Sequence, residues 1–167
     1  MSMRMTLKSY NNMNALISLC FNANAVIDNL AYNLDYHYQN EIGKIVHLNV
    51  AHVMPEWADQ VSDKMLELSG RPVRSGLADH IEEYKDLKEI FMALYDTFMQ
   101  MRELCRAMIE EADMQGDDEV RIFGEEFLDK NLSPFIKQAE EWVHASEILD
   151  ANSLNIHIKE YTHFIEV

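Results

Sequence analysis

The sequence predicts an all-α fold, an antiparallel bundle of four long helices with a longer connection between the second and the third. Glycine (5 residues) and proline (3 residues) are scarce among the 167 residues, which leaves few of the turn positions that a β fold requires. Apolar residues recur at three- and four-residue steps over four long stretches, the period of a helix with one buried face. The length fits one domain over residues 1–167, with a core bundle at about 10–150 and a tail at 151–167.

The first two helices are expected at about residues 6 or 11 to 40 and about 45 to 70. Gly43 is the predicted stop of the first, and Gly70, followed by Arg and Pro, is the predicted stop of the second. Pro55 falls inside the second helix. The helix therefore either kinks there or ends and restarts with Pro55 in its first turn, and the sequence leaves both possibilities open.

The second pair of helices follows a connection at 71–86 that has room for one short helical turn. A third helix is expected at about 85–114, with Gly116 in the turn after it. The fourth is expected at about 118–149, kinked or interrupted by Pro134. The tail beyond it is expected to form a short helix or an extended arm.

The composition excludes some classes of function. A formal net charge of −15 gives no basic footprint for phosphate, so we expect no direct DNA binding. Solubility is the simplest reason for the acidity, and attraction of cations is the sharper one. Cys20 and Cys105 lie in apolar helical patterns and are expected to be buried free thiols in a reducing compartment. With no signal peptide and no stretch of 18 apolar residues, the expected location is the cytoplasm, away from membranes.

Residues 59–73 resemble the signature of the Dps family within the ferritin-like proteins. That signature is an acid, a second acid one helical turn later, an apolar turn, and a Gly-Gly-x-Pro corner. Asp59 and Asp63 occupy the acidic positions here, and the corner is Ser-Gly-Arg-Pro at 69–72. The second acid is Asp rather than Glu, and Lys64 replaces the usual arginine. The acidic turn at 110–120 and a tryptophan late in the last helix, Trp142, also resemble the family.

The resemblance implies a ferritin-like bundle that binds iron and a ferroxidase site shared between two subunits. Asp59 and Asp63 of one subunit would face His37 and His47 of another, although these histidines are spaced more closely than in the family. Fe²⁺ would be oxidised there by peroxide or O₂, and ferric iron would be stored in the cavity of a homo-oligomeric shell, a dodecamer if the protein is Dps-like and otherwise a dimer. The implied role is protection from oxidative stress.

Independently of the resemblance, a row of ligand-type side chains on the second helix favours metal binding. His52, Glu56, Asp59 and Asp63 fall at i, i+4, i+7 and i+11, on one face of the second helix and without a lysine among them. Imidazole and carboxylate are ligands for Fe²⁺ and other divalent ions. The alternative is a solvated polar face, which every amphipathic helix has. His37 and Glu41, one turn apart, either bind metal or close the end of the bundle.

Three further features bear on function. Asp28 and Asp35 flank the first helix, where aspartates are more often solvated. Glu141 and His144 form the Glu-x-x-His pair of an intra-bundle di-iron centre, but the second such pair is missing, which favours a surface pair. The alternative function is therefore a ferritin-like bundle without a working ferroxidase centre, acting as a stress-related structural or interaction module. An unrelated helical bundle is the remaining reading.

Overall fold

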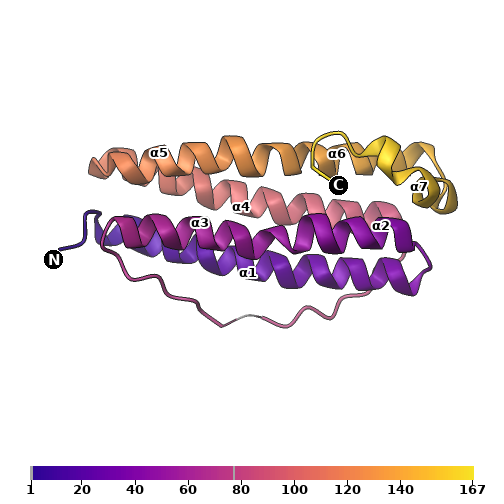
Figure 1. Ribbon diagram of the computed structural model, residues 1–167, viewed down its shortest axis with the longest axis horizontal. Helices are drawn as coiled ribbons and strands as arrows, with labels where there is room; N and C mark the ends of the chain where they lie inside the picture. Colours follow the sequence, from indigo (N-terminus) through magenta and orange to yellow (C-terminus); the bar gives the residue numbers. More distant parts are fainter. Residues whose placement is uncertain (1, 77) are drawn as a thin grey trace.

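A computed structural model describes residues 2–76 and 78–167 and contains two long helical hairpins side by side (Figure 1). Within those residues no strand occurs, so the all-α prediction is confirmed. The first hairpin consists of α1 (Leu7–Tyr36), α2 (Asn40–Ile45), the π-helical segment η1 (Val46–Ala51) and α3 (Val53–Glu67). The second consists of α4 (Leu87–Gln115), α5 (Asp118–Glu126), the π-helical segment η2 (Phe127–Leu132) and α6 (Ser133–Ile148). The chain ends with α7 (Ala151–His157) and the 3₁₀ turn η3 (Ile158–Tyr161).

The core lies between the two hairpins and is built from the predicted apolar stripes. Leu30, Phe98 and Trp142 are among its fully buried side chains. The ring of Trp57 packs edge-on against Phe135, with 4.9 Å between the ring centroids. None of the helices in the described part of the chain has the length and apolar character needed to cross a membrane.

The first helix ends earlier than predicted, at Tyr36, and Gly43 is not its stop. The chain turns at Tyr38, which takes the left-handed conformation with φ 63°. The amide of Gln39 closes the helix by donating to the carbonyl of Leu34 at 2.9 Å. Gly43 lies inside α2, where a β-carbon would collide with the side chain of Asp35 on α1. This glycine is therefore explained by close helix packing and not by helix termination.

Pro55 stands in the first turn of α3, which begins at Val53 after the π-helical segment η1, so the structure has the restart that was one of the two possibilities left open. Proline has no N–H to give to the carbonyl four residues earlier, which here belongs to Ala51. The side-chain amide of Asn24 on α1 donates to that carbonyl at 2.9 Å. Helical segments therefore follow one another closely from α2 through η1 to α3. The one backbone carbonyl that loses its helical donor receives a hydrogen bond from the neighbouring helix α1.

Pro134 stands in the first turn of α6, directly after the π-helical segment η2, so the predicted fourth helix is interrupted as expected. A regular α-helix would join the amide of Leu128 to the carbonyl of Gly124. The thiol of Cys105, on α4, stands between them: it donates to the Gly124 carbonyl at 3.2 Å and accepts from the Leu128 amide. Burial raises the pKa of Cys105 to about 11, although the Leu128 hydrogen bond lowers it, and burial with the nearby Cys105 raises the pKa of Cys20 to about 12. Both are free buried thiols, as predicted.

The connection between α4 and α5 is a tight turn, whereas the connection between α3 and α4 is long. Gly116 ends α4 in the left-handed conformation with φ 72°, as predicted. Asp117 beside it does not cap α5 and instead accepts from the hydroxyls of Thr6 and Ser9 at the start of α1, both at 2.6 Å. The connection between α3 and α4 carries no helical turn in its described residues and runs along the outside of α1 (Figure 1).

The tail folds back on α6 through a short fifth helix. Gln138, which is buried, donates to the carbonyl of Tyr161 at 3.0 Å and accepts from the amide of Phe164 at 2.9 Å. The indole of Trp142 donates to the hydroxyl of Thr162 at 3.2 Å. These bonds satisfy the polar groups that α6 buries, so the tail completes the second hairpin.

Candidate metal-binding face

The interior of the bundle offers no ligands of the ferritin type in the described residues. Its only buried polar side chains there are Ser9, Gln138 and Thr162, and no carboxylate or imidazole is buried. A di-iron centre between the four helices requires glutamates and histidines that project inward. The described residues therefore present their carboxylates and imidazoles outside the buried core.

The second helical path presents the predicted row of ligand-type side chains to solvent. His52, Glu56, Asp59 and Asp63 are all exposed. The opposite face of α3 is buried through Met54, Trp57, Val61 and Met65. The sequence spacing thus described the two faces of α3 correctly.

The closest group of such side chains joins α1 to η1. His47 on η1 contacts Asp28 on α1, with 2.9 Å between Nδ1 and Oδ1. The ring of His52 lies edge-on to the ring of His47, with 4.4 Å between centroids. When the Nδ1–H of His47 donates a hydrogen bond to Asp28, Nε2 keeps a free lone pair, the arrangement found behind metal-binding histidines.

The π-helical turn is the reason that the two histidines meet. The amide of His52 bonds to the carbonyl of His47 at 3.1 Å, five residues back. Residues bonded in this way lie one above the other, whereas in an α-helix positions five apart point about 140° away from each other. Sequence reasoning placed Asp28 among solvated flank residues because the turn that brings His47 level with it has no simple sequence signal.

His37 lies apart from this group. Its ring packs against Tyr36 at 5.2 Å between centroids, at the end of α1. Because His47 is level with Asp28, nine positions before His37, the two histidines are separated by roughly 13 Å of helix rise. Asp63 is sixteen positions beyond His47, roughly 24 Å along α3 at the same rise.

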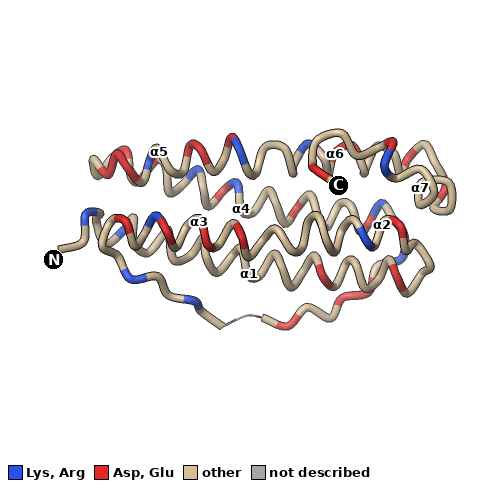
Figure 2. Tube along the Cα trace, in the orientation of Figure 1, with Lys and Arg blue, Asp and Glu red and all other residues tan. Residues whose placement is uncertain are grey.

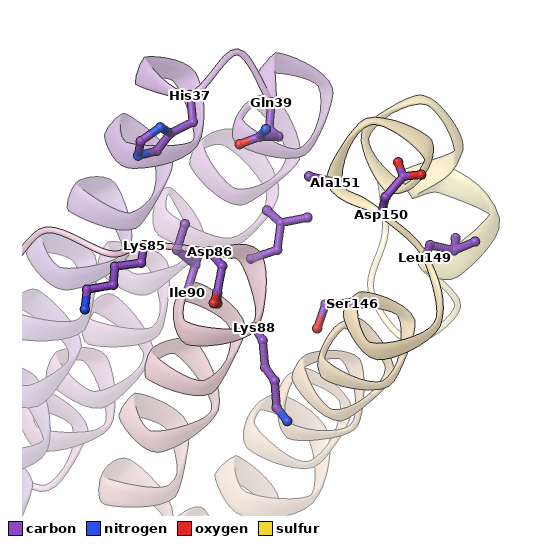
Figure 3. Close-up of a pocket in the computed structure, with 11 residues that line it drawn as sticks. His37, Gln39, Lys85, Asp86, Lys88, Ile90, Ser146, Leu149, Asp150 and Ala151 are labelled. Carbon is purple, nitrogen blue, oxygen red and sulfur yellow. The ribbon is translucent and has the colours of Figure 1, made fainter.

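His37 instead lines a pocket of about 540 Å³ at one end of the bundle (Figure 3). The carboxylates of this pocket already cap helices. Asp86 accepts from the amide of Glu89 at 2.9 Å, and Asp150 accepts from the amide of Ser153 at 2.8 Å. The backbone bond from Ser153 lowers the pKa of Asp150. With two lysines also in its lining, this pocket is a poor place for a cation.

Within one described chain no three ligand-type side chains converge tightly enough to hold a metal ion. Asp28, His47 and His52 come nearest, and we call them the α1–η1 cluster. Glu141 is engaged elsewhere, since it accepts from the amide of His163 at 3.0 Å and pairs with that imidazole rather than with His144. A complete site on the α1–α3 face would need ligands from a second subunit.

The shape of the chain closely matches solved structures. The open pore ferritin of the hyperthermophilic archaeon Archaeoglobus fulgidus superposes with a TM-score of 0.88 over 95% of this chain and 97% of that one. The chain has the ferritin fold. A second crystal structure of that ferritin gives 0.86 over 94% and 97%. Sequence identity is 14% in both, so the likeness establishes the fold and nothing finer.

No protein-family model matches the sequence, and no curated protein matches it either. The ferritin-like fold predicted from the helix pattern and the Dps-like motif is confirmed. The narrower resemblance to Dps stays a prediction. So do the roles of His37, His47, His52, Glu56, Asp59 and Asp63 as ligands.

Proposed function

We propose that this ferritin-like chain binds Fe²⁺ on its α1–α3 face, oxidises it, and holds the ferric product within a homo-oligomer. The observation that carries the proposal is the α1–η1 cluster, in which Asp28 orients His47 beside His52. The exposed acids of α3 extend the same helical path. Imidazole with carboxylate is a donor set that suits Fe²⁺.

The residues would divide the work as follows. Asp28 fixes the tautomer of His47, so that Nε2 is free to bind Fe²⁺. Asp59 and Asp63, one turn apart, would complete the coordination from a second subunit. In the oxidation, two Fe²⁺ ions each give one electron to one hydrogen peroxide, which takes up two protons and leaves as two waters. The chain supplies the iron ligands, and because Fe²⁺ and peroxide react at this site, they do not form radicals elsewhere.

The test compares Fe²⁺ binding and oxidation in the parent and two double variants. His47→Ala/His52→Ala should abolish most high-affinity binding, because loss of both imidazoles leaves one carboxylate in the cluster. Asp59→Ala/Asp63→Ala should reduce oxidation to a similar extent if these acids complete the site. The matched control is Glu103→Ala/Glu110→Ala, which removes two exposed acids from α4.

Each outcome separates one reading from another. Parental stoichiometry and rate in the histidine variant would refute the α1–η1 cluster as the iron site. Loss in the histidine variant alone would show that Asp59 and Asp63 do not complete the site. If the Glu103→Ala/Glu110→Ala control lost as much Fe²⁺ binding and oxidation as the other variants, general electrostatic attraction of cations would explain the losses.

A second candidate function rests on the apolar interior. The described core holds no carboxylate or imidazole, so it offers no ligands for a ferroxidase centre between the four helices. A ferritin-like module that serves a structural or stress-related interaction needs none. A parent protein that binds no Fe²⁺ at all would favour this reading.

A further inference from the structure

A groove with two walls lies between α1 and the end of the connection that leads into α4. Its volume is about 680 Å³. The α1 wall carries Tyr32 and Tyr36, one helical turn apart, and the other wall carries Glu83 and Tyr84. The lining is completed by Asn33, His37 and Lys85. A groove that combines aromatic rings with a carboxylate is a candidate ligand site, separate from the α1–η1 cluster.

Two asparagines of α1 hold the second wall in place. Asn33 accepts from the amide of Tyr84 at 3.3 Å. Asn29, one turn earlier, donates to the carbonyl of Glu82 at 3.2 Å. Asn33 is itself fixed, because its side-chain amide donates to the carbonyl of Asn29 at 2.8 Å. The groove is therefore built from hydrogen-bonded backbone on both sides, which lowers the entropic cost of binding a ligand there.

The tyrosine rings of the groove have faces that a ligand can reach. Tyr32 is 59% exposed and Tyr36 is 79% exposed, which is high for aromatic side chains. In residues 2–76 and 78–167, Tyr32 and Tyr84 pack against no other ring, and Tyr36 packs only against the adjacent His37. The negative face of an unstacked aromatic ring attracts cations.

The charges around the groove also favour a cation. Burial raises the pKa of the Tyr84 hydroxyl, and the carboxylates of Glu82 and Glu89 raise it further. Glu83 adds a carboxylate in the wall itself. Figure 2 shows acidic residues in the part of the connection that leads into α4. Lys85 is the opposing charge in the lining, so the carboxylates outnumber it.

We propose that this groove binds a small organic cation that carries a guanidinium group. The planar guanidinium lies against the faces of Tyr32 and Tyr36, and its N–H groups donate to the carboxylate of Glu83. A primary ammonium has no flat face to stack on the rings and is more strongly hydrated. A quaternary ammonium would match the rings but has no N–H for Glu83. Binding in this groove does not depend on iron.

The experiment uses agmatine as the probe, because it carries a guanidinium on a short alkyl chain and has no carboxylate. Calorimetric titration of the full chain should show saturable binding of agmatine. Putrescine, which has an amine in place of the guanidinium, should bind about fivefold more weakly. Agmatine should also protect Tyr32 and Tyr36 from nitration by tetranitromethane, read by peptide mass spectrometry. Tyr38, which is 85% exposed and outside the lining, is the internal control and should be nitrated at an unchanged rate.

Two pairs of tyrosine variants test the role of the ring faces. Tyr32→Leu/Tyr36→Leu should weaken agmatine binding by about tenfold or more, because both faces are lost. Tyr32→Phe/Tyr36→Phe keeps the faces and should stay within about threefold of the parent. The matched control is Tyr95→Leu, which removes a tyrosine from the surface between α4 and α6 and should leave binding unchanged.

Two charge variants test the sign of the ligand. Glu83→Gln should weaken agmatine binding by about fivefold, because a charged hydrogen bond is lost. Lys85→Met should strengthen binding by about threefold, because it removes the repelling charge. Glu103→Gln and Lys130→Met, at exposed positions of α4 and η2, make the same charge changes and should have no effect.

Several results would overturn the proposal. One is the absence of saturable agmatine binding up to about 5 mM. Others are putrescine binding as tightly as agmatine, and nitration of Tyr32 and Tyr36 that agmatine does not slow. A further one is weaker binding in Lys85→Met, with circular dichroism showing the variant folded, which would indicate a site for anions.

Discussion

At the scale of single residues, the helices depend on side chains that reach across to a neighbour's backbone. The side-chain amide of Asn24 donates to the carbonyl of Ala51. The thiol of Cys105 donates to the carbonyl of Gly124 and accepts from the backbone of Leu128. A carbonyl or amide left unpaired in such a place costs about 1–3 kcal/mol. Asn24 thus replaces the donor that Pro55 cannot supply, and Cys105 gives the Gly124 carbonyl a donor just before η2.

The role of Asn24 can be separated from the rest of its contacts by a double-mutant cycle. Asn24→Ala should destabilise the parent by about 1–2 kcal/mol, because the Ala51 carbonyl loses its donor. In a Pro55→Ala background the amide at position 55 can serve that carbonyl, so the same substitution should cost about 1 kcal/mol less. Urea unfolding of the four proteins measures both values. Additive effects, within about 0.3 kcal/mol, would contradict this account.

At the scale of elements, the two hairpins are tied together at the turn between α4 and α5. Asp117 accepts from the amide of Thr6 at 3.0 Å as well as from the hydroxyls of Thr6 and Ser9. Partial burial opposes ionisation of Asp117, but the hydrogen bonds from Ser9 and Thr6 outweigh it and lower its pKa. The start of α1 therefore depends on a carboxylate from the other hairpin.

This tie predicts a specific dependence on pH. A lowered pKa in the folded state means that the contribution of Asp117 is complete above the unfolded value of about 3.9 and is lost as the pH falls through the folded value. Asp117→Asn should cost about 1 kcal/mol at pH 7 and progressively less below pH 4. Urea unfolding over that range checks it, with the exposed neighbour Asp118→Asn as control. A cost for Asp117→Asn that stays constant down to pH 2 would refute the assignment.

At the scale of the whole molecule, the net charge of −15 controls the interaction of the protein with polyanions such as nucleic acids. Basic residues occur singly or in small groups, such as Arg71 and Arg74 in the connection between α3 and α4, as Figure 2 shows for the chain as a whole. A phosphate backbone requires several lysines and arginines on one surface to release its counterions. The protein should therefore repel nucleic acid even in an assembled state.

The corresponding prediction is that duplex DNA is not retarded by this protein at physiological salt. Gel-shift and fluorescence anisotropy measurements over a range of salt would check it, both for the chain as purified and after iron loading. Binding tighter than micromolar that weakens steeply with salt would show that an unrecognised basic surface exists. Any protection of DNA in this account comes from consumption of Fe²⁺ and peroxide.

The sequence alone determined the helical class, the buried stripes and the exposed row from His52 to Asp63, because the 3.6-residue period records which face of a helix is buried. It also located the turn at Gly116, where only a left-handed residue ends the helix well. These are local properties, and neighbouring residues in the chain suffice to define them.

Only the tertiary structure decided how the ligand-type residues are grouped. The contact between Asp28 and His47 depends on the register between α1 and η1, and the meeting of His47 with His52 depends on a π turn. Gly43 was taken for a helix stop because its true constraint, the side chain of Asp35, comes from another helix. The alignment of one helix against another is set by packing between residues that are far apart in the sequence. Local sequence patterns therefore do not predict which residues of two helices face each other.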